Sequence, residues 1–439
     1  MTIDRRRALA LGALTLGGAT MPGLAAAQGR SRARFPKGFV WGSATAGYQV
    51  EGNMLGADLW QLEQNKPTVF MEPSGDACNS FELWARDLDI VQAMGLNAYR
   101  FSVEWARIEP VRGQFSLAML DHYKAIVAGC HARGLKPLVT FNHFVAPLWF
   151  SAQGGWTHAD APALFARYCD KVARAFGADI AMAMTLNEPN ILLMLERMLP
   201  PPVWDMQAAC LDAASARLGV PRMVTANVAR RSDLPALTQG MLKGHREARA
   251  AIKAVCPDLP VGVTLSVADE QASGKDSLRD TVRAERYGAW LEAVKGDDFV
   301  GVQNYERAVW NAQGHLPPPE GADLNWSGTE VWAPSLAGAV RYVHEATGLP
   351  ILVSEHGVGT DDDTLRARFI PAALQHLHAA MDDGVPVLGY VHWSLLDNFE
   401  WIFGYKPHFG LCTVNRETFE RTPKPSASVL GAIARANAV

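Results

Sequence analysis

Several features of other protein classes are missing from this chain of 439 residues. Its 41 basic and 45 acidic side chains give a net charge of −4, so neither nucleic acid nor an anionic membrane is an expected partner. The six cysteines form no Cys-x-x-Cys pair, and no His-Glu-x-x-His sequence occurs. A Gly-x-Ser-x-Gly elbow and a Gly-rich phosphate loop are also absent. We therefore expect no metal and no cofactor.

The first 27 residues have the composition of an export signal. Arg5-Arg6-Arg7 precedes an apolar stretch at 8–24, and Ala25-Ala26-Ala27 follows it. The stretch is too short and too rich in glycine for a good membrane span. We predict a signal peptide at 1–27 that resembles a twin-arginine signal, and an exposed lead-in at 28–34. The mature protein would then be periplasmic or secreted, with no membrane attachment; an ordinary secretory signal or an uncleaved anchor is the alternative.

From residue 35 onward, short apolar runs alternate with longer stretches of helical periodicity. The apolar runs are nearly continuous, as expected for parallel strands that are buried on both faces. Their number predicts a single-domain (β/α)₈ TIM barrel over residues 35–437. A doubly wound sheet is the competing architecture, and it would usually carry the missing phosphate loop. The runs lie at 39–44, 98–102, 136–141, 181–186, 261–265, 299–303, 351–354 and 385–392.

Polar, ionisable and aromatic side chains lie at or just after the ends of these runs. In a barrel of parallel strands these ends meet at one rim, which is where catalytic groups lie. Random turn chemistry would distribute such residues over both rims. The rim residues include Arg100, His143, Asn187, Glu188, Asn304, Tyr305, Glu306, Glu355, His356, His392 and Trp393.

Two of these residues, Glu188 and Glu355, are carboxylates at the ends of two different strands. A pair of carboxyl groups that face one pocket is the minimum requirement for glycoside hydrolysis, with one protonated and the other ionised. Each glutamate alone has an ordinary explanation as a turn or ion-pair residue, but both together on one rim favour catalysis. A metal site built from His143, His356 and His392 is a minor alternative.

The ordered motifs of the chain resemble glycoside hydrolase family 1, the β-glucosidase-like retaining glycosidases. The resemblance extends from Phe35 to about Ala434. It rests on Phe35-Pro36-Lys37-Gly38-Phe39-Val40-Trp41-Gly42-Ser43-Ala44-Thr45, Tyr48-Gln49-Val50-Glu51-Gly52, Tyr99-Arg100-Phe101-Ser102, Thr185-Leu186-Asn187-Glu188-Pro189 and Trp393-Ser394-Leu395-Leu396-Asp397-Asn398-Phe399-Glu400-Trp401.

The resemblance implies a role for each matching position. Glu188 would be the general acid/base and Glu355 the nucleophile, while Arg100 and Tyr305 would hydrogen-bond the charged nucleophile. Retention would place the two carboxyl groups roughly 5 Å apart. The sugar would be bound by Gln49, His143, Asn187, Glu400 and Trp401, with Trp393 as its stacking floor.

The chain departs from the family pattern at four positions. His356 follows the nucleophile, Gln303 and Phe144 replace an Asn and a Trp, and Phe403 replaces a polar residue near the sugar's far hydroxyls. Retention of Glu400 argues against a phospho-sugar substrate. Four tryptophans are candidate platforms for the leaving group: Trp204, Trp310, Trp326 and Trp332.

These features predict a retaining, exo-acting β-glycosidase that acts on small glycosides or oligosaccharides without a cofactor. A transglycosylase, or a sugar-binding protein with little catalysis, is the alternative. Gluco, galacto and fuco substrates share most of the predicted contacts, so the motifs do not select among them. The family resemblance also allows a homo-oligomer.

Overall fold

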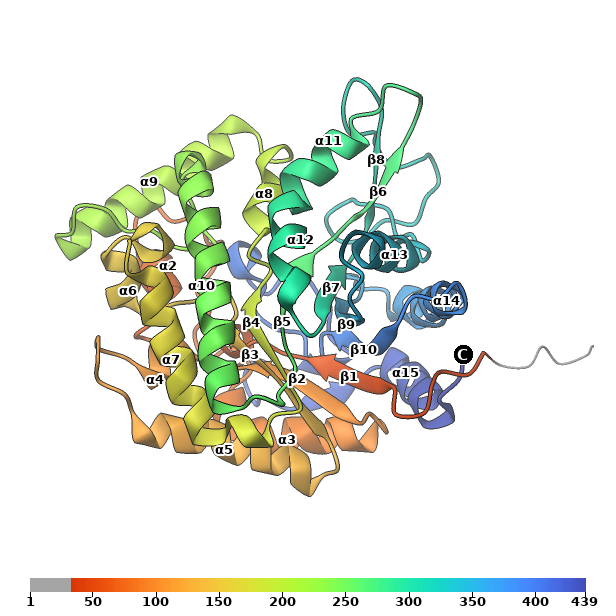
Figure 1. Ribbon diagram of the computed structural model, residues 1–439, viewed down its shortest axis with the longest axis horizontal. Helices are drawn as coiled ribbons and strands as arrows, with labels where there is room; N and C mark the ends of the chain where they lie inside the picture. The colour runs from red at the N-terminus through yellow and green to blue at the C-terminus, as the bar shows by residue number, and fades with distance from the viewer. Residues whose placement is uncertain (1–32) are drawn as a thin grey trace, which may run out of the picture. The chain divides into compact units, whose positions relative to one another are not determined.

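The computed structural model describes residues 33–439, which fold around a closed barrel of parallel strands (Figure 1). Eight strands follow one another around the barrel in the order β1-β2-β3-β4-β5-β7-β9-β10, and β10 closes against β1. They coincide with the eight predicted runs, so the predicted (β/α)₈ barrel is confirmed. The strands are β1 (Val40–Ala44), β2 (Ala98–Ser102), β3 (Lys136–Asn142), β4 (Met182–Asn187), β5 (Val261–Ser266), β7 (Val300–Asn304), β9 (Ile351–His356) and β10 (Val387–Trp393).

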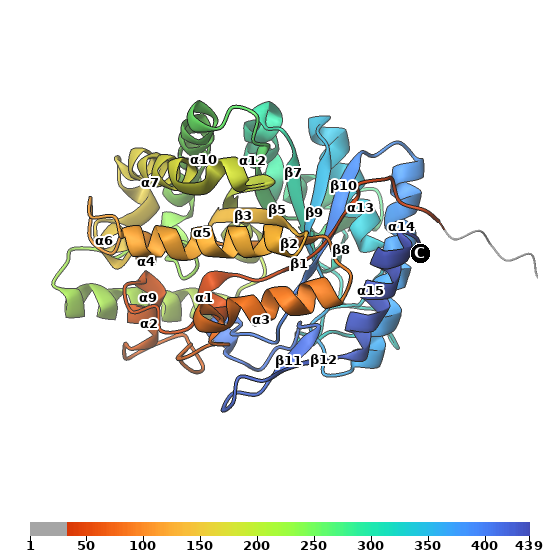
Figure 2. The same cartoon turned by 90° about the horizontal axis from the view of Figure 1, so that it is seen from below.

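Long helices connect the strands along the outside of the barrel, because parallel neighbours require a crossover. α7 and α10 lie side by side (Figure 1), as do α3 and α5 (Figure 2). The outer helices are α3 (Ser80–Ala93), α5 (Leu117–Ala132), α7 (Ala161–Phe176), α10 (Leu234–Val255), α11 (Arg279–Arg283), α12 (Ala289–Ala293), α13 (Ser335–Thr347), α14 (Asp363–Asp382) and α15 (Pro425–Ala436).

Helix α7 illustrates why these segments are helical. Pro162 occupies its first turn, where a missing N–H costs nothing. Its buried side chains recur every three or four residues, which places them on one face toward the barrel. They are Ala161, Pro162, Leu164, Phe165, Tyr168, Cys169, Val172, Ala173 and Phe176.

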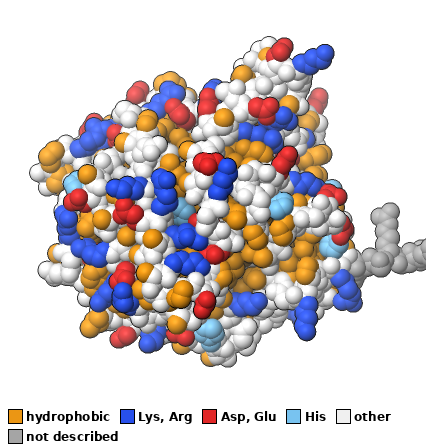
Figure 3. All heavy atoms as spheres, in the orientation of Figure 1, with side chains coloured by type: hydrophobic (Ala, Val, Ile, Leu, Met, Phe, Trp, Pro, Cys, Tyr) orange, Lys and Arg blue, Asp and Glu red, His pale blue; other side chains and the backbone are white. Residues whose placement is uncertain are grey.

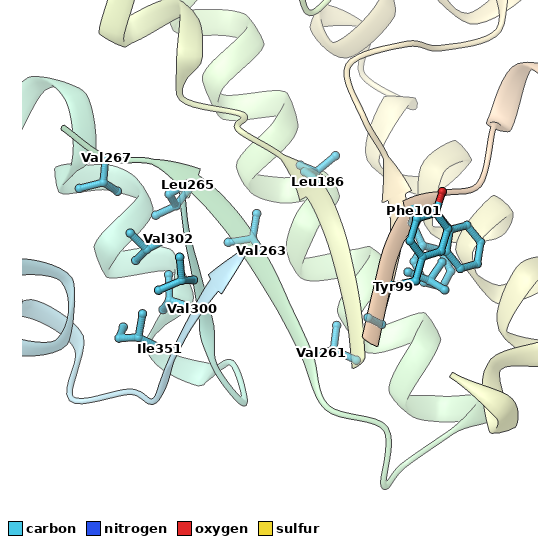
Figure 4. Close-up of a cluster of buried hydrophobic side chains, with 14 of the residues drawn as sticks. Tyr99, Phe101, Leu186, Val261, Val263, Leu265, Val267, Val300, Val302 and Ile351 are labelled. Carbon is cyan, nitrogen blue, oxygen red and sulfur yellow. The ribbon is translucent and has the colours of Figure 1, made fainter. Parts of the chain in front are cut away.

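Alternate residues of each strand belong to two different buried layers. Outward-facing side chains pack against the helices; Figure 4 shows Val261, Val263 and Leu265 of β5 in this layer, with Val263 and Leu265 near Val300 and Val302 of β7. Inward-facing side chains fill the barrel itself and form a separate cluster. That inner cluster includes Val40, Ala44, Ala98, Leu138, Met182, Met184, Leu352, Val391 and Trp393.

Shorter elements occupy the ends of the barrel. β6 (Asp269–Ala272) pairs in parallel with β8 (Arg307–Trp310), and β11 (Cys412–Val414) pairs with β12 (Arg421–Pro423). The short helices are α1 (Gly47–Val50), α2 (Asp58–Glu63), α4 (Trp105–Ile108), α6 (Leu148–Ala152) and α8 (Ile191–Glu196). The longer α9 (Pro201–Leu218) follows α8.

The barrel unit begins slightly before the predicted boundary. The backbone of Ala33 exchanges hydrogen bonds with Val439, and Arg34 pairs with Ala438. Residues 33 and 34 therefore belong to the unit that spans 33–439, rather than to the predicted lead-in. The predicted signal peptide, and the rest of the lead-in, lie outside the described residues.

The surface and the cysteines fit a globular domain. Basic and acidic side chains are interspersed on the face shown in Figure 3. Within residues 33–439, no helix is both long enough and apolar enough to cross a membrane. All six cysteines are free thiols, and five of them are buried.

Candidate active site

A cavity of about 360 Å³ opens at the carboxyl ends of the barrel strands. Nine of the ten predicted site residues line it, and they come from segments that are far apart in the sequence. Arg100 is the exception: it is fully buried next to the cavity and contacts two of the residues that line it. The nine are Gln49, His143, Asn187, Glu188, Tyr305, Glu355, Trp393, Glu400 and Trp401.

The two strands that lead to the glutamates both change register just before the carboxylate. In β9, Ser354 is an extra residue between Val353 and Glu355, whose partners are consecutive residues of β7. In β4, one extra residue lies between Met184 and Asn187 relative to β5. Such bulges turn the following side chains to a different face. They turn the polar ends of both strands into the cavity.

Two donors hold the carboxylate of Glu355. Arg100 Nη1 donates to its Oε1 at 2.5 Å, and Tyr305 Oη donates to its Oε2 at 2.6 Å. Burial raises the pKa of Glu355, but the charge of Arg100 and the hydrogen bond from Tyr305 act in the opposite direction. Both donors stabilise the ionised form, and each of them holds one oxygen of the carboxylate in position.

Glu188 has a different environment. Its side chain is buried, and no basic side chain among residues 33–439 forms an ion pair with it. Burial, and then the negative charge of Glu355, raise the pKa of Glu188 to about 8. At neutral pH the proton therefore resides on Glu188, while the two donors to Glu355 favour its ionised form. This division of protonation states is what an acid catalyst and a nucleophile require.

The side-chain amide of Asn187 is fixed in one orientation. Its Oδ1 accepts hydrogen bonds from Arg100 Nη2 at 2.6 Å, Gln303 Nε2 at 2.8 Å and Thr264 Oγ1 at 3.2 Å. Its Nδ2 is buried and has no partner among the described residues. A donor in this state is available to a ligand hydroxyl.

Three other predicted sugar-binding residues have unpartnered polar atoms. Gln49 Nε2 donates to the Phe399 carbonyl at 2.8 Å, which leaves its Oε1 without a partner in the described chain. His143 Nδ1 and Glu400 Oε1 are buried and unpartnered in the same sense. Burial lowers the pKa of His143 and raises that of Glu400, so both shifts favour the neutral form of the side chain. Buried polar groups normally have partners, so this set suits a polyhydroxylated ligand.

Aromatic rings form one side of the same pocket. The ring of His143 is nearly parallel to Trp393, with centroids 5.7 Å apart, and to Trp401 at 5.9 Å. Phe144, Glu188 and Trp401 all have positive φ angles, which cost free energy in residues other than glycine. Such strain concentrates at functional sites, where the surrounding structure maintains it.

The four departures from the family pattern have distinct positions. Gln303 supports Asn187, and Phe144 lines the cavity beside His143. Phe403 lies at the mouth of the cavity and is 40% exposed. His356 does not line the cavity: it is buried and its Nδ1 lies 3.0 Å from Tyr390 Oη.

The alternative metal site is not formed. His392, like His356, hydrogen-bonds Tyr390 Oη, so both rings lie among the buried side chains outside the barrel, away from His143. Within residues 33–439, no group of three or more His, Cys, Asp or Glu side chains has the geometry of a metal site. The rim prediction was therefore wrong for these two histidines, because their strand positions direct them outward.

Of the four tryptophans considered as platforms, only Trp326 lines this cavity. Trp204 and Trp310 are buried, and Trp310 Nε1 donates to Glu270. The guanidinium of Arg307 lies over the ring of Trp332, and its Cζ is 3.8 Å from the ring centroid. Thr264 and Gln303, which support Asn187, have no role in the site predicted from the sequence; a lone polar residue in an apolar strand is the signal that could have identified them.

Comparisons with known proteins agree with this geometry. The sequence profile of the family described as "Glycosyl hydrolase family 1" matches residues 31–294 and 303–439. The chain is 29% identical to a beta-glucosidase of Agrobacterium sp. (strain ATCC 21400), over 92% of this chain and 95% of the relative.

Two solved structures share both sequence and fold. The beta-glycosidase BGL167 is 43% identical with a TM-score of 0.87, over 92% of this chain and 98% of the other. An apo beta-glucosidase is 39% identical with a TM-score of 0.88, over 91% and 98%. The barrel, the paired glutamates and the profile that matches nearly all of the described chain lead to one conclusion: the protein belongs to glycosyl hydrolase family 1.

Proposed function

We propose that this glycoside hydrolase is a retaining, exo-acting β-glycosidase that removes one sugar from a small β-glycoside by double displacement. Glu355 Oε attacks the anomeric carbon while Glu188 protonates the leaving oxygen, which gives a covalent glycosyl-enzyme. Glu188, now ionised, then deprotonates water, and the water oxygen displaces Glu355 from the anomeric carbon. The sugar leaves with its β configuration, and Glu188 regains its proton.

The observation that supports this mechanism most strongly is the unequal treatment of the two carboxyl groups. Glu355 has a guanidinium on one oxygen and a phenol on the other, whereas Glu188 has neither and is protonated at neutral pH. Asn187 Nδ2, supported by three donors on its Oδ1, would donate to the sugar's 2-hydroxyl. This hydrogen bond strengthens in the transition state.

The roles can be tested with Glu355→Ala. We expect hydrolysis of aryl β-glycosides to fall by at least about 10⁴-fold, because the covalent step loses its nucleophile. Azide fits the space left by the carboxylate, so it should restore partial turnover and give a glycosyl azide of inverted configuration. Near-normal hydrolysis by this variant would show that Glu355 is not the nucleophile.

We also propose that residues 1–27 direct export by the twin-arginine route, so that the mature enzyme acts in the periplasm or outside the cell. The support is the order of Arg5-Arg6-Arg7, the apolar stretch and Ala25-Ala26-Ala27. Cell fractionation of wild type and of the Arg5→Lys, Arg6→Lys, Arg7→Lys variant tests this. Full-length precursor as the only species in the cell would contradict it. A homo-oligomer remains a prediction that size-exclusion chromatography can check.

A further inference from the structure

Two fully buried histidines, His356 of β9 and His392 of β10, take no part in the proposed mechanism. They are partners in the sheet, and Tyr390 of β10 lies beside both on the outer face of the barrel. The Tyr390 Oη is 3.0 Å from His356 Nδ1 and 3.0 Å from His392 Nδ1. Within residues 33–439, the Nε2 atoms of the two rings have no partner. The three side chains form a His–Tyr–His bridge that depends on one hydroxyl.

The bridge requires that the two imidazole rings differ in tautomer. Burial lowers the pKa of His356 to about 3 and that of His392 well below its ordinary value, so it favours the neutral form of both rings. A phenol has one proton, so Tyr390 donates to one Nδ1 and accepts from the N–H of the other. Loss of the hydroxyl would leave both buried rings without a polar partner in the described chain. The hydroxyl therefore fixes both rings together.

The His–Tyr–His bridge spans the bulge of β9. Tyr390 is the sheet partner of Val353, which precedes the bulge. His392 is the partner of His356, which follows it. Between these two pairs β10 has one residue and β9 has two, and the second of the two is the nucleophile Glu355. Because an extra residue turns the side chains that follow it, the bridge joins the two sides of the feature that directs Glu355 into the cavity.

The chain after the nucleophile is held as closely. The ring of His356 is nearly parallel to that of Phe369 of α14, with centroids 5.0 Å apart. A Cβ at Gly357 would lie 2.1 Å from the carbonyl oxygen of Trp393, so this backbone passes in contact with the end of β10. Trp393 follows the second histidine of the bridge and lines the cavity. The bridge therefore links the residue after Glu355 to the residue before the predicted stacking floor of the sugar.

We infer that Tyr390 and His356 are positioning residues for Glu355: the His–Tyr–His bridge holds the bulge of β9 and so sets where the nucleophile meets the sugar. This inference rests on the proposed function, because Glu355 is the nucleophile of that reaction. Neither positioning residue lines the cavity, so their effect passes through the backbone of β9. A small displacement of the attacking oxygen slows the chemical step more than it weakens binding.

The test measures the attack of Glu355 with dinitrophenyl 2-deoxy-2-fluoro-β-glucoside and the corresponding galactoside as probes. Glu355 Oε bonds to the anomeric carbon, and dinitrophenolate leaves with the electrons of the broken bond, without the proton of Glu188. The fluorine slows the second displacement, so the glycosyl-enzyme accumulates. The amount of dinitrophenolate released in the burst counts the folded sites, and the rate constant of the burst reports the placement of Glu355.

Tyr390→Phe removes the shared hydroxyl and keeps the ring. We expect the rate constant of the burst to fall about tenfold, while the dissociation constant of the probe changes less than about twofold. His356→Leu should cause a similar loss. His356→Asn should keep most of the wild-type rate, because its side-chain amide can bond the Tyr390 hydroxyl in place of the imidazole Nδ1.

Tyr168→Phe is the matched control. Tyr168 is also fully buried outside the barrel, and its Oη lies 2.9 Å from the Val103 oxygen and 3.1 Å from the Phe141 oxygen. The change removes a buried hydroxyl with two partners, neither of which belongs to β9 or β10. It should lower the melting temperature about as much as Tyr390→Phe does and keep the wild-type rate constant.

An unchanged rate constant in Tyr390→Phe, with only fewer folded sites or a lower melting temperature, would overturn the inference. An equal fall in Tyr168→Phe would also overturn it, because lost stability would then explain both results. If Tyr390→Phe does not fold, the two His356 variants decide: equal rates for His356→Asn and His356→Leu contradict the bridge. If the wild type gives no burst with either probe and hydrolyses no aryl β-glycoside, the proposed function fails first, and this inference fails with it.

Discussion

The floor and the mouth of the same cavity differ in the side chains that line them. On the floor, Gln49, His143, Asn187 and Glu400 each have a buried polar atom without a partner in the described chain. At the mouth, Asn325 uses its amide to close its own turn, and side chains such as Ile191 and Phe403 provide the contact surface. The floor is prepared for a hydroxylated ring, whereas much of the surface at the mouth is apolar.

This difference divides the free energy of binding between two kinds of contact. Unpartnered buried groups regain hydrogen bonds only when a correctly placed hydroxyl arrives, which gives strong discrimination among sugars. Apolar contact depends on area and tolerates different shapes. We therefore expect changes on the floor to alter the rate of the chemical step, and changes at the mouth to alter the choice of aglycone.

Among the variants that test this division, Glu188→Gln should have the largest effect. General acid catalysis contributes about 10²–10⁴-fold, so kcat/KM for an alkyl glycoside should fall by that factor. A dinitrophenyl glycoside needs no proton on its leaving group, so its loss should be much smaller. An equal loss on both substrates would mean that Glu188 does not protonate the leaving oxygen.

The pH dependence follows from the same residue. A pKa of Glu188 near 8 keeps its acid form below that pH, and the acid form is lost as the pH rises through about 8. kcat/KM should therefore fall about tenfold per pH unit in the alkaline range, and fall at low pH as Glu355 gains its proton. The alkaline decrease should disappear in Glu188→Gln. If the decrease persists in this variant, a group other than Glu188 causes it.

Gln303→Leu should have an intermediate effect through Asn187. The change removes one of three donors to Asn187 Oδ1, so the amide that meets the 2-hydroxyl is less well oriented. We expect kcat to fall roughly tenfold with little change in KM, because the contact strengthens in the transition state. A 2-deoxy glycoside lacks this contact and serves as the control. If the variant loses as much activity on that substrate, Gln303 does not act through Asn187.

The barrel could be predicted from the sequence because its strands are covered on both faces. Burial on both sides leaves nearly continuous apolar runs, such as residues 261–265, and each run ends where the chain meets solvent. The positions of Glu188 and Glu355 at strand ends then followed from the topology, since all parallel strands end at one rim.

The orientation of residues within that rim could not be predicted in the same way. Side chains alternate along a strand, so one extra residue reverses the direction of all that follow. The extra residue at Ser354 turns Glu355 inward and leaves His356 facing outward to Tyr390. No local pattern in the sequence indicates such a bulge. The support that Gln303 and Thr264 give to Asn187 is also a contact between different strands, which a linear pattern does not contain.

The smallest effect is expected for Ser327→Ala, which tests the polar groups of the mouth. Ser327 lines the cavity as the polar residues of the floor do, but its Oγ already donates to Asn325 Oδ1 at 2.8 Å. The backbone amides of Ser327 and Thr329 still hold the turn after the substitution. An exposed change of this kind costs at most about 0.5 kcal/mol, so kcat/KM for a methyl β-glycoside, a benzyl β-glycoside and a β-linked disaccharide should each change less than about twofold. A selective loss on the disaccharide would show that the mouth does recognise a hydroxyl, and the contrast between floor and mouth would then be one of degree.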